Sequence, residues 1–325
     1  MRVPVMVMVS LAFTVPALAQ GGPSFDCARA STAVERAICK SADVANADRE
    51  MAALYVVLSR RISGPARDHL AADQMRWNGA RGQSCPGQLE QCLKEKYTTR
   101  IERLKFMASD PYPFVSDQAI VRSGKVKATR FIIDASYPQF DGTTADFSAL
   151  NRQLATAARN ASEQAVPDSD IGPGMDQIWT YRQNFSLYRP AANAISVVTN
   201  QHSYTGGAHG NGSTSAILVD LRTGRAVLPS TVFVLGNAWM RSVVAFVTAD
   251  LRKQFSERPG FDEALEVGNI GKLLRAPGRW VFKAESLRIV FNAYEVGPYS
   301  AGLYEVEIPY TRIRSFLSPD GLLGR

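Results

Sequence analysis

The sequence predicts an α+β protein: a small all-helical N-terminal domain linked by disulfides, followed by a domain with a mainly antiparallel sheet and one long helix. Three observations support this prediction. All four cysteines lie before residue 93, in a region where apolar residues recur at helical spacing. Beyond residue 130, several segments alternate apolar and polar residues, as half-buried strands do. Helices and strands do not alternate regularly there, which favours an antiparallel sheet over βαβ units.

The length and composition are those of a globular protein with two domains. The chain has 325 residues, of which 46% are hydrophobic and 21% charged, enough for two ordinary cores. We divide it into a signal peptide (1–19), a helical domain (20–107), a linker (108–125) and an α+β domain (126–325). The linker is suggested by two prolines in four residues, at Pro111 and Pro113, which oppose regular structure.

The N-terminus has the pattern of a secretory signal peptide. One positive charge, Arg2, precedes a short apolar run that ends in Ala17-Leu18-Ala19, with small residues at the last and third-last positions. The run is too short for a membrane span, and no later segment approaches that length. We therefore expect a periplasmic or secreted protein.

The cysteines predict disulfides. An even number of cysteines in an exported chain reads as a disulfide framework, and four cysteines allow three pairings. We favour Cys27 with Cys39 and Cys85 with Cys92, because each pair closes a short local loop. The alternative is a structural zinc site, and it lacks the usual Cys-x-x-Cys spacing.

Four short helices are predicted in the first domain. Thr32 and Glu35 form a capping box that starts a helix ending near Cys39. A second helix begins after Asp43 or Asn46 and ends at Gly64-Pro65. The third stops among glycines near residue 80, and the fourth runs from Pro86. The apolar face of the second and fourth helices consists of Met51, Leu54, Tyr55, Leu58, Ile62, Leu89, Leu93, Tyr97, Ile101 and Leu104.

The order of residues in this region resembles a known family. The matching segments are Phe25-Asp26-Cys27, Ala30 to Cys39, Asp48 to Tyr55, Gln74 to Trp77, and Cys85 and Cys92 before Tyr97 and Arg100 to Leu104. Together they resemble the LprI-like domain of secreted bacterial proteins, named for a lysozyme inhibitor. The resemblance covers about residues 25 to 106. It implies a helical disulfide-linked fold and, as a weaker inference, inhibition of lysozyme.

The second domain is predicted to mix strands and helices. Helices are expected over Ser148 to Glu163 and over Asn237 to Phe255, with Asn237 as N-cap. Gly172-Pro173-Gly174 is expected to be a loop, and Arg222 to Arg225 a turn. The expected strands contain Phe131 to Pro138, Tyr181 to Leu187, Ala194 to Thr199, Ser215 to Leu221, Leu287 to Phe291 and Tyr304 to Ile308.

This half also resembles a known domain. The matching segments are Ser203 to Gly210, Asp220 to Gly224, Phe291 to Gly302 and Ile308-Pro309-Tyr310. They resemble the RsiV-type C-terminal domain, and residues 126 to 200 resemble its usual N-terminal companion. In the anti-sigma factor that gives the domain its name, this region binds lysozyme. The signalling role of that factor is not implied here, because neither a membrane helix nor a sigma-binding segment is predicted.

A glycine-rich loop is the first candidate site. His202 to Gly212 holds four glycines and two of the three histidines of the chain. Glycines so closely spaced imply backbone shapes that other residues avoid. A metal would need a third ligand, and the sequence identifies none, so we expect His209 to bond backbone within the turn. The partner-binding candidates here are Tyr204, Gly206, Gly207 and His209.

A second loop carries the other candidates. In Tyr294 to Tyr299 a Gly-Pro turn lies between two tyrosines, and tyrosines on a rigid turn bury much area at low entropic cost. The candidates are Tyr294, Glu295, Pro298 and Tyr299. If both loops lie at the same end of the sheet, they form one binding face. The alternative is that this turn only connects two strands.

Charge argues against nucleic-acid binding. The formal charge is +7, but the arginines are scattered rather than grouped in a basic stripe. Between Asp134 and Asp176, the sequence contains seven acidic residues and only two arginines. This acidic segment is expected to offset locally the repulsion between the chain and a basic partner.

The motifs favour binding over catalysis. Gly-x-Ser-x-Gly, His-Glu-x-x-His and a Ser-x-x-Lys motif with its usual partners are absent from the sequence, and Glu305 and Glu307 read as a solvated strand face. We expect no enzyme activity, no metal and no cofactor. The leading hypothesis is an exported envelope protein that binds and inhibits lysozyme or a related muramidase. The alternatives are a module that binds peptidoglycan or another envelope glycan and, less favoured, a zinc-dependent envelope hydrolase.

Overall fold

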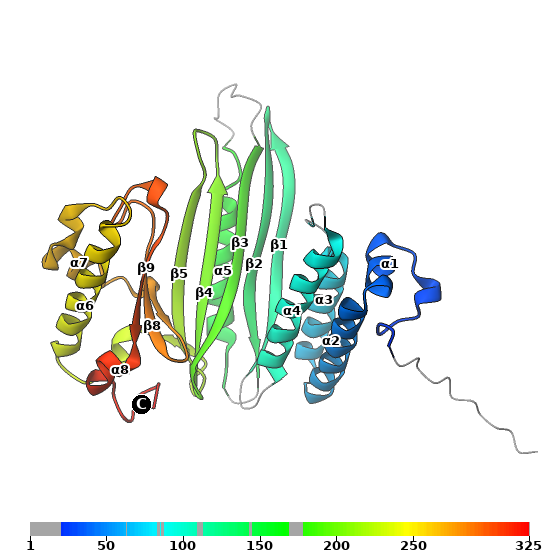
Figure 1. The fold of residues 1–325 in the computed structure, drawn as a ribbon, viewed down its shortest axis with the longest axis horizontal. Coiled ribbons are helices and arrows are strands. Elements are labelled where there is room, and N and C mark those ends of the chain that lie inside the picture. The colour runs from blue at the N-terminus through cyan, green and yellow to red at the C-terminus, as the bar shows by residue number, and fades with distance from the viewer. Residues whose placement is uncertain are drawn as a thin grey trace, which may run out of the picture. The chain divides into compact units, whose positions relative to one another are not determined.

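The computed structural model describes residues 21–62, 64–82, 85, 88–108, 113–142, 145–168 and 178–324 (Figure 1). The signal peptide, the Pro111 end of the linker and the Gly172-Pro173-Gly174 loop lie outside these ranges. Contacts divide the chain into two compact units. The described residues up to Arg61, with Met75–Phe106, form the N-terminal unit; Ile62–Gln74, with the residues from Met107 onward, form the C-terminal unit. The α+β class is confirmed.

Helices make up the regular structure of the N-terminal region. They are η1 (Cys27–Arg29), α1 (Ala33–Lys40), α2 (Ala42–Arg61), α3 (Pro65–Ala80) and α4 (Leu89–Ala108). The predicted capping box is present: Thr32 accepts from the Glu35 N–H, and Glu35 accepts from the Thr32 N–H. Among the described residues, no helix is both long and apolar enough to pass through a membrane.

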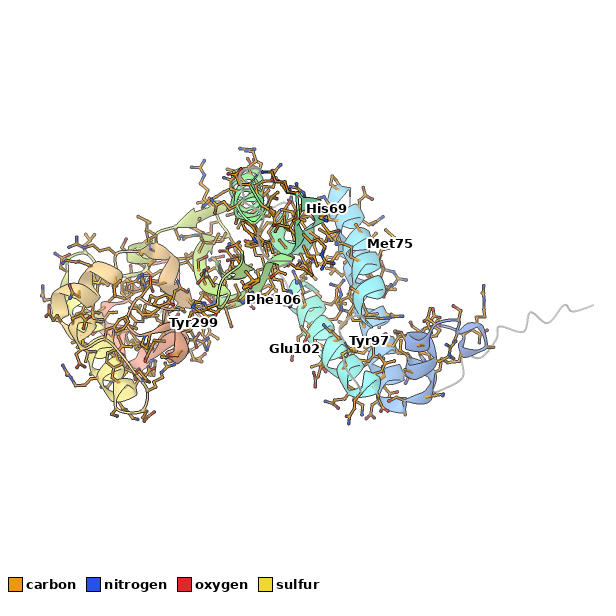
Figure 2. All side chains as sticks on the ribbon, turned by 90° about the horizontal axis from the view of Figure 1, so that it is seen from above. His69, Met75, Tyr97, Glu102, Phe106 and Tyr299 are labelled. Carbon is orange, nitrogen blue, oxygen red and sulfur yellow. A yellow bond between two sulfur atoms is a disulfide. The ribbon has the colours of Figure 1, made fainter. Side chains whose placement is uncertain are left out.

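A buried carboxylate organises the core of the N-terminal unit. Asp48 is only 1% exposed, and a buried charge needs donors around it. It accepts from the Tyr97 hydroxyl at 2.7 Å and from the Ser24 N–H at 2.7 Å. Burial, together with this bond to Asp48, raises the pKa of the Tyr97 phenol. Trp77 packs edge-on against Tyr97 at 5.0 Å, and Tyr97 lies among the helices in Figure 2.

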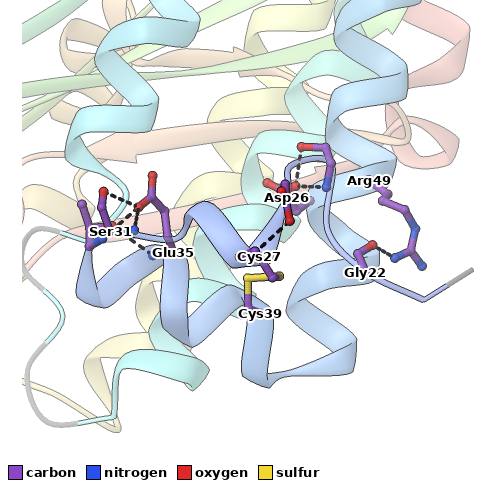
Figure 3. Close-up of a disulfide and its surroundings, with 11 residues drawn as sticks. Gly22, Asp26, Cys27, Ser31, Glu35, Cys39 and Arg49 are labelled. Carbon is purple, nitrogen blue, oxygen red and sulfur yellow. Dashed lines mark hydrogen bonds between the residues drawn. A yellow bond between two sulfur atoms is a disulfide. The ribbon is translucent and has the colours of Figure 1, made fainter. Parts of the chain in front are cut away.

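Two disulfides hold the short helices together. Cys27–Cys39 joins η1 to α1, and Cys85–Cys92 joins the segment before α4 to its first turn. These are the two local pairs favoured from the sequence. Figure 3 shows the first disulfide, whose Cys39 lies near the end of α1, and the start of the same helix, where Glu35 accepts from Ser31 and Thr32. The backbone N–H groups of Thr32 and Ser31 lower the pKa of Glu35 to about 2.

A six-stranded sheet forms the first layer of the C-terminal unit. Its strands follow each other in sequence order. Neighbours are antiparallel except β2 and β3, which are parallel and are linked through helix α5 (Ser148–Glu163). The strands are β1 (Phe114–Val126), β2 (Thr129–Asp141), β3 (Ile178–Ala191), β4 (Ala194–Tyr204), β5 (Asn211–Asp220) and β6 (Arg225–Val227).

Strand β1 corrects the expected linker. Most of the 108–125 segment belongs to the sheet, because Phe114–Val126 pairs with β2 along its whole length. Its first three residues are all buried, and the stretch from Val121 to Lys125 is exposed on both faces. A strand with this burial pattern has no apolar–polar alternation in its sequence, so periodicity does not reveal it.

A smaller sheet and a helix form the second layer. Strands β7 (Trp280–Phe282), β8 (Ser286–Phe291) and β9 (Tyr304–Pro309) pair antiparallel. One face packs on α6 (Ala238–Phe255) in the main core. Asn237 stands at the N-cap of α6, as the sequence predicted, although its side chain makes no cap bond. The remaining elements are η2 (Pro229–Val232), η3 (Asp262–Leu265), α7 (Val267–Leu273), η4 (Pro277–Arg279), η5 (Tyr299–Ala301), α8 (Tyr310–Ile313) and η6 (Arg314–Phe316).

The two sheets pack face to face over β4 and β5. Val281 and Val290 of the small sheet join a buried cluster with Val198 and Ala216 of the large one. The Phe282 N–H also donates to the Ser196 hydroxyl at 3.3 Å. This contact holds the loop between β4 and β5 in a defined position relative to the loop that follows β8.

Glu307 makes the stability of the small sheet depend on pH. Burial raises its pKa, but hydrogen bonds from Ser286, Arg288 and Lys283 outweigh that effect and lower the pKa to about 2. A depressed pKa stabilises the fold above the unfolded-state value of about 4.3, and that stabilisation is lost as the pH falls towards 2. We expect the advantage of wild type over Glu307→Gln in urea unfolding to shrink between pH 5 and pH 2.5. A constant difference would contradict this assignment.

Candidate functional site

The loop between β4 and β5 is shaped by its glycines. Gly206 and Gly207 adopt φ values of 95° and 92°, a region that side chains disfavour. The Tyr204 hydroxyl donates to the Gly207 carbonyl at 3.0 Å and braces the turn. A Cβ at Gly210 would lie 2.7 Å from the His202 ring and 2.8 Å from the Ser203 carbonyl oxygen. The glycines therefore serve a tight loop, as the sequence predicted.

The loop after β8 is a compact turn with a strained residue. The Tyr294 N–H donates to the Gly297 carbonyl at 2.9 Å, and the Glu295 N–H donates to the Asn292 carbonyl at 3.1 Å. Tyr294 has a φ of 69°, which costs a residue with a side chain roughly 1–2 kcal/mol. Its side chain nevertheless remains 57% exposed. Such strain persists only where the surroundings impose it, and it often marks functional positions.

An ion pair beneath this turn holds it in place. Arg279 is 8% exposed, and its two terminal nitrogens donate to the two carboxylate oxygens of Glu295 at 2.9 and 3.0 Å. Glu295 also accepts from the Asn292 N–H at 2.7 Å, and Arg279 donates to the Val290 carbonyl at 3.2 Å. Two-point pairing of this kind fixes orientation as well as distance. The Glu295 side chain is thus engaged inside the turn.

Asn292 ties the base of the turn to β5. Its side-chain oxygen accepts from the Thr214 N–H at 2.7 Å, and its amide donates to the Thr214 carbonyl at 3.3 Å. The side chain therefore pairs with β5 as a neighbouring strand would, at a position beyond the part of β5 that pairs with β6. The bases of the two candidate loops are joined by these bonds.

The tips of the two loops meet in an aromatic cluster, which we define as His209, Tyr294 and Tyr299. The His209 ring stacks on Tyr299 with centroids 3.8 Å apart and planes at 15°. The centroid of Tyr294 is 6.0 Å from that of Tyr299. The Tyr294 hydroxyl lies 3.4 Å from His209 Nε2. The structure thus brings the two predicted loops together at one face.

The hydrogen bonds of His209 indicate its tautomer. Nδ1 lies 2.9 Å from the Gly210 carbonyl oxygen, and a carbonyl can only accept, so Nδ1 carries a proton. In the neutral ring, Nε2 then accepts from the Tyr294 hydroxyl. The backbone bond matches the role expected for His209 from the sequence. The cluster offers ring faces, a hydroxyl and an imidazole, a set suited to recognition.

The remaining candidate residues support the cluster. Tyr204 is half-buried at the end of β4. Pro298 is half-buried at the N-cap of η5, which begins at Tyr299 (Figure 2). Glu295 holds the turn through Arg279. Sequence reasoning missed Arg279 and Asn292, because their partners are 16 and 78 residues away and no periodic pattern marks them.

Among the described residues, no group of three or more His, Cys, Asp or Glu side chains is placed to hold a metal. The carboxylates of β9 and of the acidic segment instead pair with basic side chains. Arg288 donates to both Glu305 and Glu307. In the acidic segment, Asp141 pairs with His69 at 3.1 Å and Glu163 pairs with Arg122.

Two family models match parts of the chain. Residues 26–104 match "Lysozyme inhibitor LprI", in agreement with the resemblance found for the first domain. Residues 230–311 match "Protein of unknown function (DUF3298)"; the RsiV-type resemblance itself is not confirmed by this match. No match was found among the curated proteins. Neither of the two matching family descriptions names a catalytic activity.

Two solved structures are similar to the chain. One is a DUF3298 family protein from Pseudomonas aeruginosa PAO1, with 18% identity and a TM-score of 0.46; the match covers 66% of this chain and 97% of that one. The other is a member of the same family from Bacteroides fragilis, with 15% identity and a TM-score of 0.44; the match covers 65% of this chain and 97% of that one.

Proposed function

We propose that the chain is an exported protein of the bacterial cell envelope, periplasmic or secreted, that binds lysozyme or a related muramidase and inhibits it. The observation that carries this proposal is the match of residues 26–104 to the lysozyme inhibitor LprI model. That segment includes all four cysteines and both disulfides. Disulfides persist in oxidising compartments, which agrees with a protein that meets lysozyme outside the cytoplasm.

The aromatic cluster of the C-terminal unit is the contact that we propose for the muramidase. Its rings are already stacked and its turn is already held by Arg279 and Asn292. A preorganised contact loses little conformational entropy on binding, so more of its interaction energy appears as affinity. Tyrosine is also among the residues enriched in binding hot spots.

The proposed mode of inhibition is occupation of the catalytic cleft. A muramidase cleaves its glycan between two carboxyl groups that flank the scissile bond. The exposed Tyr294 enters this cleft, its ring takes the place of a sugar, and its hydroxyl donates to one of the carboxylates. His209 and Tyr299 support the tyrosine from behind, because both lie against it in the free protein.

A lysis assay tests this function. Purified mature chain is mixed with a c-type lysozyme and a suspension of bacterial cell walls, and the fall in turbidity is followed. We expect the lysis rate to drop as the chain approaches an equimolar ratio, and the two proteins to elute together in gel filtration. Unchanged lysis with no complex at micromolar concentration would refute the proposal. If variants with substitutions in the aromatic cluster still inhibit lysozyme, the contact with lysozyme lies in the helical unit instead.

A further inference from the structure

Beside helix α5, the large sheet has exposed side chains at Asn211, Ser213 and Ser215 of β5. The buried cluster on this face joins β2 and the first residues of β3 to the end of α5 through Ile133, Tyr181 and Ala165, with Ala161 of α5 packed against it. Across β4 and β5 on the same face, the side chains alternate with those that face the small sheet. Two adjoining cavities lie here, between α5 and the two strands. A third cavity, also lined by Gln153, continues along β5 towards β6, η2 and η4.

The three cavities adjoin one another, and we refer to them together as the groove. The first, of about 260 Å³, shares Gln201 with the second, of about 120 Å³. The second shares Gln153, Ser215 and Ile217 with the third, of about 330 Å³. The groove therefore follows β5 from Asn211 to Leu218. At a rise of ~3.4 Å per residue, that is roughly 24 Å, long enough for several sugar units.

The groove is uncharged. None of the described residues that line the three cavities is Asp, Glu, Lys, Arg or His. The contrast with the small sheet is informative, because its polar strand face carries Arg288, Glu305 and Glu307. A strand face that is merely solvated has no reason to avoid charge. Six successive positions of the groove are neutral and polar: Thr199, Gln201, Ser203, Asn211, Ser213 and Ser215.

The polar groups of the groove are arranged in a ladder. Ser213 donates to Gln201 at 3.2 Å, Gln201 donates to Gln183 at 3.0 Å, and Tyr181 donates to Gln183 at 2.8 Å. These bonds hold the amides in fixed orientations. By contrast, Gln153 of α5 and Gln164, the residue after α5, have no side-chain hydrogen-bond partner within the described parts of the chain, so they are available to a ligand.

The groove also has an apolar floor. Val197, Leu154, Ala157 and Ile217 line the second cavity beside the amides and hydroxyls. Ligand sites commonly combine an apolar surface with a few fixed polar groups. A sugar ring matches this combination, because it has apolar C–H faces and a rim of hydroxyl or acetamido groups. An anionic ligand is disfavoured, because none of the described lining residues would neutralise its charge.

We propose that the groove between α5 and strands β4 and β5 binds a neutral oligosaccharide chain. The amides of Gln153, Gln164 and Gln201 hydrogen-bond its hydroxyl or acetamido groups, and the apolar floor packs against its rings. This site is distinct from the aromatic cluster and does not depend on the proposed inhibition of lysozyme. It gives the chain a direct contact with glycan in addition to the contact with a glycan-cleaving enzyme.

Titration calorimetry with tetra-N-acetylchitotetraose, without any lysozyme, tests the site. The full mature chain is compared with Ser215→Arg, which places a long charged side chain where two cavities meet. The matched control is Ser123→Arg, at an exposed position of the edge strand β1. A further variant, Gln153→Ala, removes one amide from the surface of α5. Thermal unfolding of each variant shows that it folds.

We expect chitotetraose to bind the wild type and Ser123→Arg equally. Binding should weaken at least tenfold in Ser215→Arg and severalfold in Gln153→Ala. Tyr294→Gly, in the aromatic cluster, should bind as the wild type does. The proposal is overturned if chitotetraose does not bind, or if folded Ser215→Arg binds it normally. It is also overturned if the groove instead takes an acetylated and amidated hexapeptide of alternating Ser and Val.

Discussion

Tyr294→Gly is expected to weaken the complex with lysozyme at least tenfold while leaving the chain as stable as the wild type. The loss follows from the exposure of the ring, which is 57% accessible and is the part of the cluster that we place in the cleft. A tenfold loss corresponds to about 1.4 kcal/mol, less than is typical for a central hot-spot residue.

Stability should be preserved because glycine suits this backbone. Tyr294 has a φ of 69°, and removing its side chain relieves roughly 1–2 kcal/mol of strain. The loss of the contacts with His209 and Tyr299 opposes that gain. The net change in the free energy of unfolding should therefore be within about 1 kcal/mol. A purely structural tyrosine would show the opposite pattern, with stability lost and affinity kept.

Lys127 provides the matched control. Among the described residues, it and Tyr294 are the non-glycine residues with positive φ, and Lys127 lies in the turn between β1 and β2. Lys127→Gly should relieve similar strain and leave lysozyme binding unchanged. Surface plasmon resonance for affinity and urea unfolding for stability measure both quantities. If the two variants bind lysozyme equally well, Tyr294 is not a contact residue.

Glu295→Ala should destabilise the C-terminal unit by about 3 kcal/mol. The substitution leaves the Arg279 guanidinium, which is 8% exposed, without its carboxylate. Removing one partner of a buried ion pair typically costs ~3–5 kcal/mol, and we take the lower end because the Glu295 side chain is 26% exposed. The Asn292 N–H also loses its acceptor. For a unit of this size, the melting temperature should fall by roughly 6–12 °C.

The surface pair between Arg122 and Glu163 serves as the reference. Their side chains are 43% and 60% exposed, and exposed pairs contribute about 0–1 kcal/mol. Glu163→Ala should therefore change the melting temperature by no more than about 4 °C. Calorimetry on both variants compares the same substitution in two settings. Similar changes in melting temperature for the two variants would mean that the Arg279–Glu295 pair contributes no more to stability than an exposed pair does.

Glu295→Ala should also weaken the proposed contact with lysozyme. The turn from Asn292 to Gly297 positions Tyr294, and Glu295 holds that turn to Arg279. A loosened turn must be ordered again on binding, which reduces affinity. Lysozyme binding should weaken in the folded variant, by less than in Tyr294→Gly.

Local features of the fold follow from the sequence. The capping box at Thr32, the disulfide pairs and the bounds of α5 lie where the sequence places them. Each depends on residues within about one helix or one short loop, so spacing alone carries the information. Strand β1 departs from this rule, because its burial does not alternate and leaves no periodic signal.

The glycine and tyrosine loops were also identifiable from the sequence, but their arrangement was not. Positive φ at Gly206 and Gly207 requires glycine, and such residues can be read directly. The stacking of His209 on Tyr299 joins residues 90 positions apart, and Asn292 reaches Thr214 across 78 positions. These contacts exist only because the small sheet packs on β4 and β5.

The groove beside α5 shows the same limit. Its neutral side chains on β4 and β5 are visible in the sequence as an ordinary polar strand face. That Gln153 of α5 and Gln164 just after it line adjoining cavities depends on where the parallel crossover places the helix. The sequence by itself thus determined most of the elements, the Thr32 capping box and the loop chemistry, and it favoured the two disulfide pairs that form, since these rest on neighbouring residues. Only the packing of the two sheets and α5 decided which distant side chains meet, because burial of their apolar faces sets that geometry.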